Sequence, residues 1–126
     1  MPVTQDFKLP SSPKHLELPE KANQKLFLAF IASKDPVTKQ SWCPDVRAAL
    51  PVIEAKFSGD EFEVGFVEVG QRPEWRVPSN VFRTTWNVHN VPTLVRYERV
   101  DGEVKETGRL VENEILSQKT LNGLVQ

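Results

Sequence analysis

The sequence predicts an α/β domain with a central mixed β-sheet flanked by helices. Strand-like and helix-like segments alternate along most of the chain, and this alternation requires parallel strands joined by crossover connections. A hairpin signal at Asp101-Gly102 adds antiparallel strands near the C-terminus. The run 25–32 is apolar at both odd and even positions, which is typical of a central strand covered on both faces. The expected order is β-α-β-α-β-α-β-β-α in a single domain over residues 1–126.

The N-terminal part predicts a short edge strand, a short helix and the first central strand. The edge strand is expected at Phe7-Lys8-Leu9. Ser12 followed by Pro13 is typical of an N-cap with proline in the first helical position. The central strand is the apolar run 25–32, and the polar segment 33–41 after it is expected to be a loop.

A helix is expected at 44–57 because its apolar residues recur at spacings of three and four. The residues of that buried face are Val46, Leu50, Ile53 and Phe57. Pro51 lies inside this helix and is expected to kink it, because proline lacks the N–H that the helical hydrogen bond needs.

The next segments predict a second central strand at 61–69, where apolar residues alternate, and a loop with two prolines at 70–79. A short helix is expected at 80–86.

The C-terminal part predicts a hairpin and a final helix. Its strands are expected at 93–98 and 103–110, joined by the Asp101-Gly102 turn. The helix is expected at 112–125, with one apolar face. The residues of that face are Ile115, Leu116, Leu121 and Leu124.

Composition narrows the functional classes. The chain has 126 residues, a net charge of −1 and a pI near 6.1, so charge gives no reason to expect nucleic acid or an anionic membrane as partner. No apolar run approaches the roughly 20 residues that span a bilayer, and no secretory signal is recognised at the N-terminus. A single cysteine and two histidines exclude an internal disulfide and a closed Cys/His zinc site. We expect a cytoplasmic protein without a metal or other cofactor.

Four motifs, in order along the chain, resemble those of the thioredoxin domain-containing protein 17 family within the thioredoxin-like superfamily. The resemblance covers about residues 20–126, whereas residues 1–20 match poorly. The motifs are Trp42-Cys43-Pro44-Asp45, Pro51, Gly70-Gln71-Arg72-Pro73-Glu74-Trp75 and Val91-Pro92-Thr93-Leu94.

This resemblance implies a thioredoxin-like fold and the activity of a small cytosolic disulfide reductase that takes electrons from thioredoxin reductase. Cys43 takes the place of the nucleophile of the family's Trp-Cys-Pro-Asp-Cys motif. Val46 stands where the family has its second, resolving cysteine, and this departure removes the dithiol cycle. The substrates implied are disulfide-containing proteins or small thiol compounds, with glutathione or thioredoxin reductase as reductant.

The position of Cys43 at the start of a helix favours its thiolate. The backbone N–H groups of Asp45 and Val46 belong to the first turn and are expected to stabilise a sulfur anion. The Asp45 carboxylate acts in the opposite direction. The alternative interpretation is that Cys43 is a small buried apolar residue.

The resemblance also implies the rest of the site. A cis peptide bond is expected before Pro92, in a turn that faces Cys43, and the Val91 backbone would pair with an extended substrate. Trp42 would form an apolar platform beside the thiol, so the expected groove consists of Trp42, Pro44, Asp45, Val91 and Pro92.

Other candidate residues receive weaker interpretations. Trp75 and Trp86 are assigned to packing, and His89 to a surface loop. The cations Lys34, Lys39 and Arg47 could form a rim near the thiol, although most such charges are only solvated.

Two functional hypotheses stay open. In the first, the protein is a monothiol disulfide oxidoreductase, and an external thiol resolves the mixed disulfide formed at Cys43. In the second, it is a redox-inactive module that binds extended peptide segments. We expect a monomer, with a dimer linked through Cys43 as a further possibility.

Overall fold

The computed structural model describes residues 3–18, 25–59 and 62–125. Its elements are β1 (Val3–Thr4), η1 (Pro13–His15), β2 (Leu26–Ile31), α1 (Pro44–Lys56), β3 (Glu63–Glu68), α2 (Arg72–Trp75), α3 (Val81–Thr84), β4 (Thr93–Val100), β5 (Glu103–Val111), α4 (Asn113–Leu116) and α5 (Gln118–Val125).

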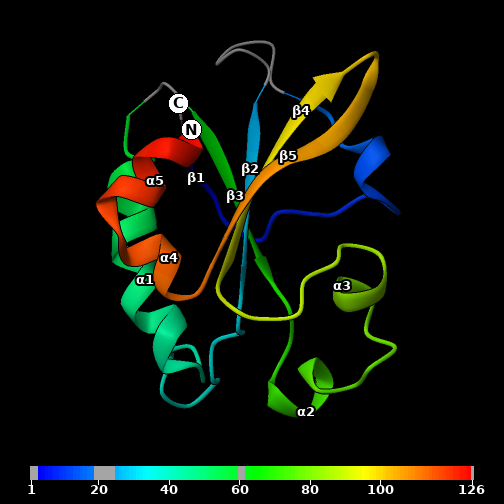
Figure 1. The fold of residues 1–126 in the computed structure, drawn as a ribbon. Coiled ribbons are helices and arrows are strands. Elements are labelled where there is room, and N and C mark those ends of the chain that lie inside the picture. Colours follow the sequence, from blue (N-terminus) through cyan, green and yellow to red (C-terminus); the bar gives the residue numbers. More distant parts are fainter. Residues whose placement is uncertain (1–2, 19–24, 60–61, 126) are drawn as a thin grey trace.

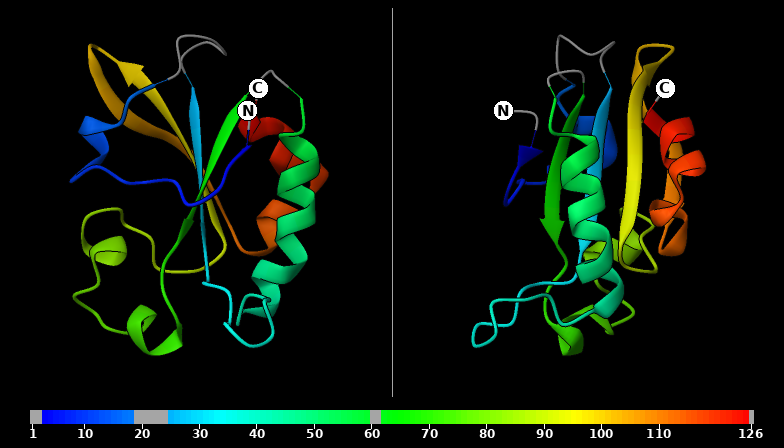
Figure 2. Two further views of the ribbon diagram at one scale, coloured as in Figure 1. Left: turned by 180° about the vertical axis from the view of Figure 1, so that it is seen from behind. Right: turned by 90° about the vertical axis from the view of Figure 1, so that its left-hand side faces the viewer.

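The strands form one mixed sheet in the order β1-β3-β2-β4-β5 (Figure 1). β2 and β3 are parallel, as are β1 and β3, whereas β4 pairs antiparallel with both β2 and β5. Helices α1, α4 and α5 lie together on one side of the sheet, and η1 and α3 lie on the other (Figures 1 and 2). The α/β fold class with a flanked mixed sheet is confirmed.

β2 is the centre of the sheet, and all six of its residues are buried, as the apolar run predicted. Aromatic side chains fill the space beside it. The Trp86 ring lies 6.2 Å from the rings of both Phe30 and Tyr97, measured between centroids. Trp75 and Trp86 are both buried, which confirms their assignment to packing.

The N-terminal prediction needs correction. The edge strand is Val3–Thr4, not Phe7-Lys8-Leu9. Phe7 instead donates its N–H to the Phe66 carbonyl at 2.9 Å, and its ring lies directly over Gly65, where only a glycine leaves room. The short helix after Ser12 is a single 3₁₀ turn, and the Ser12 side chain makes no capping hydrogen bond.

The segment predicted as a loop at 70–79 contains the one-turn helix α2. Gln71 and Glu74 form a capping box at its start, and Pro73 lies in its first turn, so the turn is stabilised locally. The expected second strand is present as β3, and residue 61 of that prediction lies outside the described residues.

The final helix is two helices rather than one. Ser117 has extended backbone angles (φ −83°, ψ 121°), so α4 ends there and α5 starts again with a rotated face. Ile115, Leu121 and Leu124 are buried as predicted, but Leu116 is 41% exposed, because it follows buried Ile115 in α4 and adjacent helical residues point in different directions. Among the described residues, no helix is both long and apolar enough to cross a bilayer.

Candidate functional site

The thiol of Cys43 lies where the loop after β2 meets α1. Cys43 is the N-cap residue of α1, with extended backbone angles, and Pro44 follows in the first helical position. The preceding loop is held by buried Ser41, whose hydroxyl donates to the Ala32 carbonyl at 2.9 Å and accepts from the Cys43 N–H at 3.3 Å. Cys43 is half-buried, and it lines a surface pocket.

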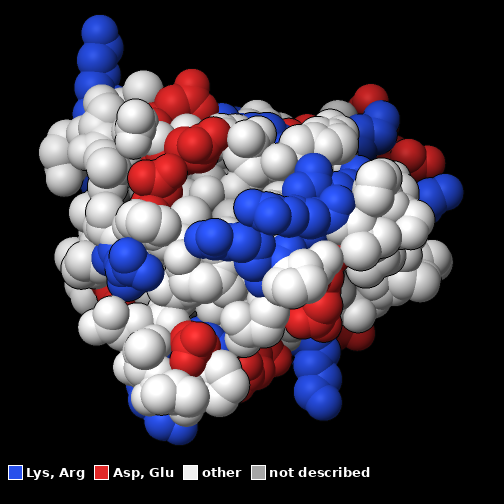
Figure 3. All heavy atoms as spheres, turned by 90° about the horizontal axis from the view of Figure 1, so that it is seen from below, with Lys and Arg blue, Asp and Glu red and all other residues white. Residues whose placement is uncertain are grey.

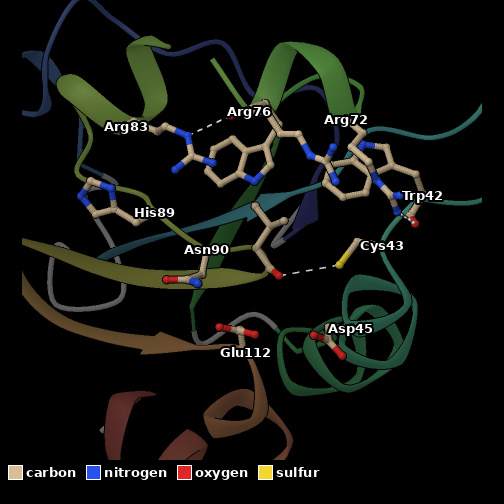
Figure 4. Close-up of a pocket in the computed structure, with 11 residues that line it drawn as sticks. Trp42, Cys43, Asp45, Arg72, Arg76, Arg83, His89, Asn90 and Glu112 are labelled. Atoms are coloured by element: carbon tan, nitrogen blue, oxygen red, sulfur yellow. Dashed lines mark hydrogen bonds between the residues drawn. The ribbon is translucent and has the colours of Figure 1, made fainter. Parts of the chain in front are cut away.

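The thiol faces the turn before β4. The Sγ atom of Cys43 lies 3.8 Å from the Val91 carbonyl oxygen, and the Val91–Pro92 peptide bond is cis (Figure 4). Hydrogen bonds hold this turn on both sides: Thr93 Oγ1 donates to the Asn90 carbonyl at 2.6 Å, and the Glu112 N–H donates to the Pro92 carbonyl at 2.9 Å. The Val91 N–H has no acceptor among the described residues, so it is free to pair with a bound strand.

Arg109 holds the other end of the same loop. Its guanidinium donates to the Asn87 carbonyl at 2.7 Å and to the Trp86 carbonyl at 3.4 Å. Both of its remaining bonds go to the Glu106 carboxylate, at 2.7 Å each, and this pairing raises the pKa of Arg109. Arg109 therefore ties the loop that carries Val91 to β5.

In the structure, the Cys43 thiol is directed to the Val91 carbonyl rather than to the first-turn N–H groups of α1. No side-chain capping bond is made by Cys43, because its thiol is directed to the Val91 carbonyl. A neutral thiol is a weak donor and needs an acceptor, whereas only the thiolate would accept from the first turn. That the Asp45 and Val46 N–H groups stabilise the ionised form stays a prediction.

Val46 lies one helical turn after Cys43 but does not line the pocket beside the thiol. Its side chain is fully buried with Ala49 and Ile53 on the core face of α1. The position that a second thiol would occupy is thus part of the hydrophobic core in this chain.

The other predicted groove residues divide into two groups. Trp42, Asp45 and Val91 line one pocket together with Cys43, whereas Pro44 and Pro92 do not line it. Trp42 is partly buried, and its indole N–H donates to the Gly70 carbonyl at 3.0 Å. This bond fixes the tryptophan against the segment that leads into α2.

The pocket has a basic wall that the sequence interpretation missed. Arg72, Arg76 and Arg83 line it, together with exposed His89 and Asn90 (Figure 4). Seen from the end of the molecule where α2 and α3 lie, basic side chains form a band across the face (Figure 3). The sequence signal for this wall is the four-residue spacing of Arg72 and Arg76. That spacing places the two side chains on one face only if the segment is helical.

The cations predicted as a rim lie elsewhere. Lys34, Lys39 and Arg47 line a separate pocket with Ser41 and Leu50. Arg47 turns back along its own helix and donates to the Ser41 carbonyl at 2.6 Å, which keeps its charge away from the Cys43 pocket. No group of three metal-ligating side chains occurs in the described ranges 3–18, 25–59 and 62–125.

A mixed sheet, a cysteine at a helix start and a cis-proline turn facing it define a protein of the thioredoxin fold. Solved structures agree: a mutant thioredoxin from Halobacterium salinarum superposes with a TM-score of 0.61 at 18% identity, covering 98% of this chain and 87% of that one. The chain belongs to the thioredoxin domain-containing protein 17-like family, whose thioredoxin-domain sequence model matches residues 6–126. The expected family is therefore confirmed.

Two relatives illustrate the similarity. A thioredoxin domain-containing protein of Schizosaccharomyces pombe is 46% identical over 96 residues, which covers 75% of this chain and 77% of that protein. Thioredoxin domain-containing protein 17 of Homo sapiens is 35% identical over 85 residues, which covers 66% of this chain and 68% of that protein.

Proposed function

We propose that this protein is a thiol–disulfide oxidoreductase in which Cys43 is the sole protein nucleophile and an external thiol completes the reaction. The observation that supports the proposal is the position of half-buried Cys43, whose sulfur lies 3.8 Å from the carbonyl of Val91; the N–H of Val91 is unpaired among the described residues. A substrate segment that pairs with the Val91 backbone would lie beside the nucleophile.

The reaction has two exchange steps. The Cys43 thiolate attacks one sulfur of a substrate disulfide, which forms a mixed disulfide with Cys43 and releases the other sulfur as a thiolate. For a glutathionylated protein, the released group is the protein thiol, and glutathione stays on Cys43. A free glutathione thiolate then attacks that adduct, which regenerates the Cys43 thiolate and gives glutathione disulfide. The external thiol is required because Val46 supplies no second sulfur.

The surrounding residues have separate tasks. Trp42, fixed by its bond to the Gly70 carbonyl, offers an apolar surface beside the sulfur. The Val91 backbone would hold the substrate in an extended conformation. The first-turn N–H groups of α1 would stabilise Cys43 once it leaves as a thiolate. The glutathione pool of a reducing cytosol would supply the second thiol, and thioredoxin reductase is the alternative reductant.

The test uses a glutathionylated peptide. Mixing it with the reduced protein should transfer one glutathionyl group to Cys43, detected by intact mass, and free glutathione should then remove it. Cys43→Ala is the control and should gain no adduct. If wild-type Cys43 stays unmodified, the protein is not a disulfide oxidoreductase by this route. A species of twice the chain mass that disappears on reduction would instead indicate a dimer linked through Cys43.

A further inference from the structure

We infer that the basic wall of the Cys43 pocket is a subsite for a carboxylate of the substrate, formed by Arg72, Arg76 and Arg83. This inference rests on the proposed function for the identity of the ligand as a disulfide substrate. It adds a preference: the disulfides accepted here carry an acidic side chain or carboxylate close to the sulfur that Cys43 attacks.

Two of the three guanidinium groups are held in place without an acidic partner. Arg83 stacks on the Trp75 ring at 4.1 Å, and its Nε donates to the Trp75 carbonyl at 2.8 Å. Arg72 lies over the Trp42 ring at 5.1 Å, and Nη2 reaches the Trp42 carbonyl at 3.5 Å. Stacking on an aromatic face leaves the N–H edge of a guanidinium available, and that edge binds a carboxylate through two parallel hydrogen bonds.

None of the three arginines of this wall is in an ion pair with a described residue. The ion pairs found within residues 3–18, 25–59 and 62–125 are Arg96–Glu98 and Arg109–Glu106, and neither includes a pocket arginine. Arg76 is exposed, and its backbone N–H donates to the Arg72 carbonyl, but its guanidinium makes no hydrogen bond to another described residue. Three cations close together repel one another, so an anion between them would be stabilised.

The opposite wall has the other sign. Asp45 from the first turn of α1 and Glu112, which follows β5, lie across the Cys43–Val91 line from the arginines (Figure 4). Neither carboxylate is in an ion pair with a described residue. A substrate with its acidic group toward α2 and α3 is therefore favoured, whereas the reverse orientation places like charges together. A ligand that carries negative charge along its whole length, such as a phosphate polymer, would be repelled by Asp45 and Glu112. A ligand with a single carboxylate avoids this repulsion.

Matched peptides test the inference. Each has a central cysteine activated as a 2-thiopyridyl disulfide, and glutamate or glutamine stands on either its N-terminal or its C-terminal side. Attack by Cys43 on the peptide sulfur joins the peptide to the protein and releases pyridine-2-thione, which reports the rate. One glutamate placement should react about fivefold faster than its glutamine twin, since an exposed ion pair changes such rates by roughly two- to fivefold.

Three changes should weaken this preference. Arg76→Gln should reduce it, the double change Arg72→Gln and Arg76→Gln should reduce it further, and 1 M salt should suppress it for the wild type. Arg99→Gln is the matched control, because Arg99 lies on the β4–β5 hairpin, away from α2 and α3, and should leave the preference intact (Figure 1). Equal rates for glutamate and glutamine peptides in both placements, or an undiminished preference in the double variant, would overturn the inference.

A binding measurement tests the carboxylate subsite independently of whether Cys43 reacts with disulfides. Cys43→Ala is titrated with the same peptides carrying serine in place of cysteine, and the NMR signals of the indole and guanidinium N–H groups are followed. The glutamate peptide should shift the Trp42, Trp75 and arginine signals, and the glutamine peptide should not. Absence of these shifts overturns the subsite even if Cys43 is reactive, whereas their presence supports it even if Cys43 is inert. S-methylglutathione, added alone, shows whether a small molecule can supply the carboxylate.

Discussion

The sulfur of Cys43 lies 3.8 Å from the carbonyl oxygen of Val91, a residue 48 positions further along the chain. One partner comes from the start of α1 and the other from the cis-proline turn before β4. Parallel pairing of β2 with β3 and antiparallel pairing of β2 with β4 place the two segments at the same end of the sheet. The sheet topology thus creates the relationship on which the proposed chemistry depends.

Restoring a cysteine at position 46 should restore resolution within the protein. Val46→Cys places a thiol one helical turn from Cys43, and an intramolecular reaction gains a large proximity advantage. The glutathione adduct of Cys43 should then decay on the order of 100-fold or more faster without added thiol. Adduct mass against time measures this decay. Val46→Ala, which lacks the thiol, should keep the adduct as long as the wild type, and equally persistent adducts in the cysteine variant would contradict the prediction.

The glycine of β3 should not tolerate a side chain. A Cβ atom at position 65 would lie 2.5 Å from Cδ2 of Phe7, so Gly65→Ala requires Phe7 to move. We expect it to lower the free energy of unfolding by about 1–3 kcal/mol, as overpacking does. Gly123→Ala is the control: nothing lies within 4 Å of its Cβ position, and alanine in α5 should stabilise by about 0.5–1 kcal/mol. Urea unfolding should show a lower free energy of unfolding for Gly65→Ala and a higher one for Gly123→Ala than for the wild type.

Tyr97 should destabilise the fold at alkaline pH. Burial raises the pKa of its phenol well above the usual value near 10, and Glu106 adds to this shift while Arg109 opposes it. Below about pH 10 the phenol is neutral in both the folded and the unfolded chain, and its contribution to folding stability is fully present. Above that pH the unfolded chain ionises and the folded chain does not, so stability falls by about 1.4 kcal/mol per pH unit.

This effect can be followed directly, because Tyr97 is the chain's only tyrosine. Tyrosinate absorbance should appear together with unfolding, rather than as an independent titration near pH 10. Tyr97→Phe should remove this slope in chemical unfolding at pH 10 to 11. A native phenol that titrates near its ordinary pKa would refute the prediction.

Arg109→Gln should loosen the turn that carries Val91. The change removes the bonds to the Trp86 and Asn87 carbonyls and the pairing with Glu106. We expect a loss of about 1–3 kcal/mol in stability and slower adduct formation at Cys43. Arg99→Gln removes an exposed charge and should change the free energy of unfolding by no more than about 0.5 kcal/mol. It should leave the rate of adduct formation unchanged. Unchanged reactivity in a destabilised Arg109→Gln protein would limit Arg109 to a structural role.

Elements with strong local signals could be predicted, and elements decided by packing could not. β2 was predictable because an apolar run of that length needs cover on both faces. The strand β1 was misplaced because two residues carry no periodicity, and the fit of Phe7 over Gly65 decides where the chain pairs. The break at Ser117 was missed because serine is tolerated inside a helix by propensity alone.

The same division holds for the candidate site. Cys43, Trp42 and Val91 could be proposed because the resemblance carried them, and they line one pocket. The arginines of α2 and α3 were missed, since each is an ordinary surface cation until its segment folds over Trp42 and Trp75.

The sequence by itself determined that one thiol stands at the start of a helix and that Val46 offers no second sulfur. It also determined β2, α1, β3 and the β4–β5 hairpin in that order, since hydrophobic periodicity is a local property, but neither α2 nor the division of the final helix. Only the tertiary structure decided that Val91 faces the thiol and that arginines and carboxylates occupy opposite walls of its pocket. Those relationships join segments far apart in the chain, and they arise only when burial of the shared core brings the segments together.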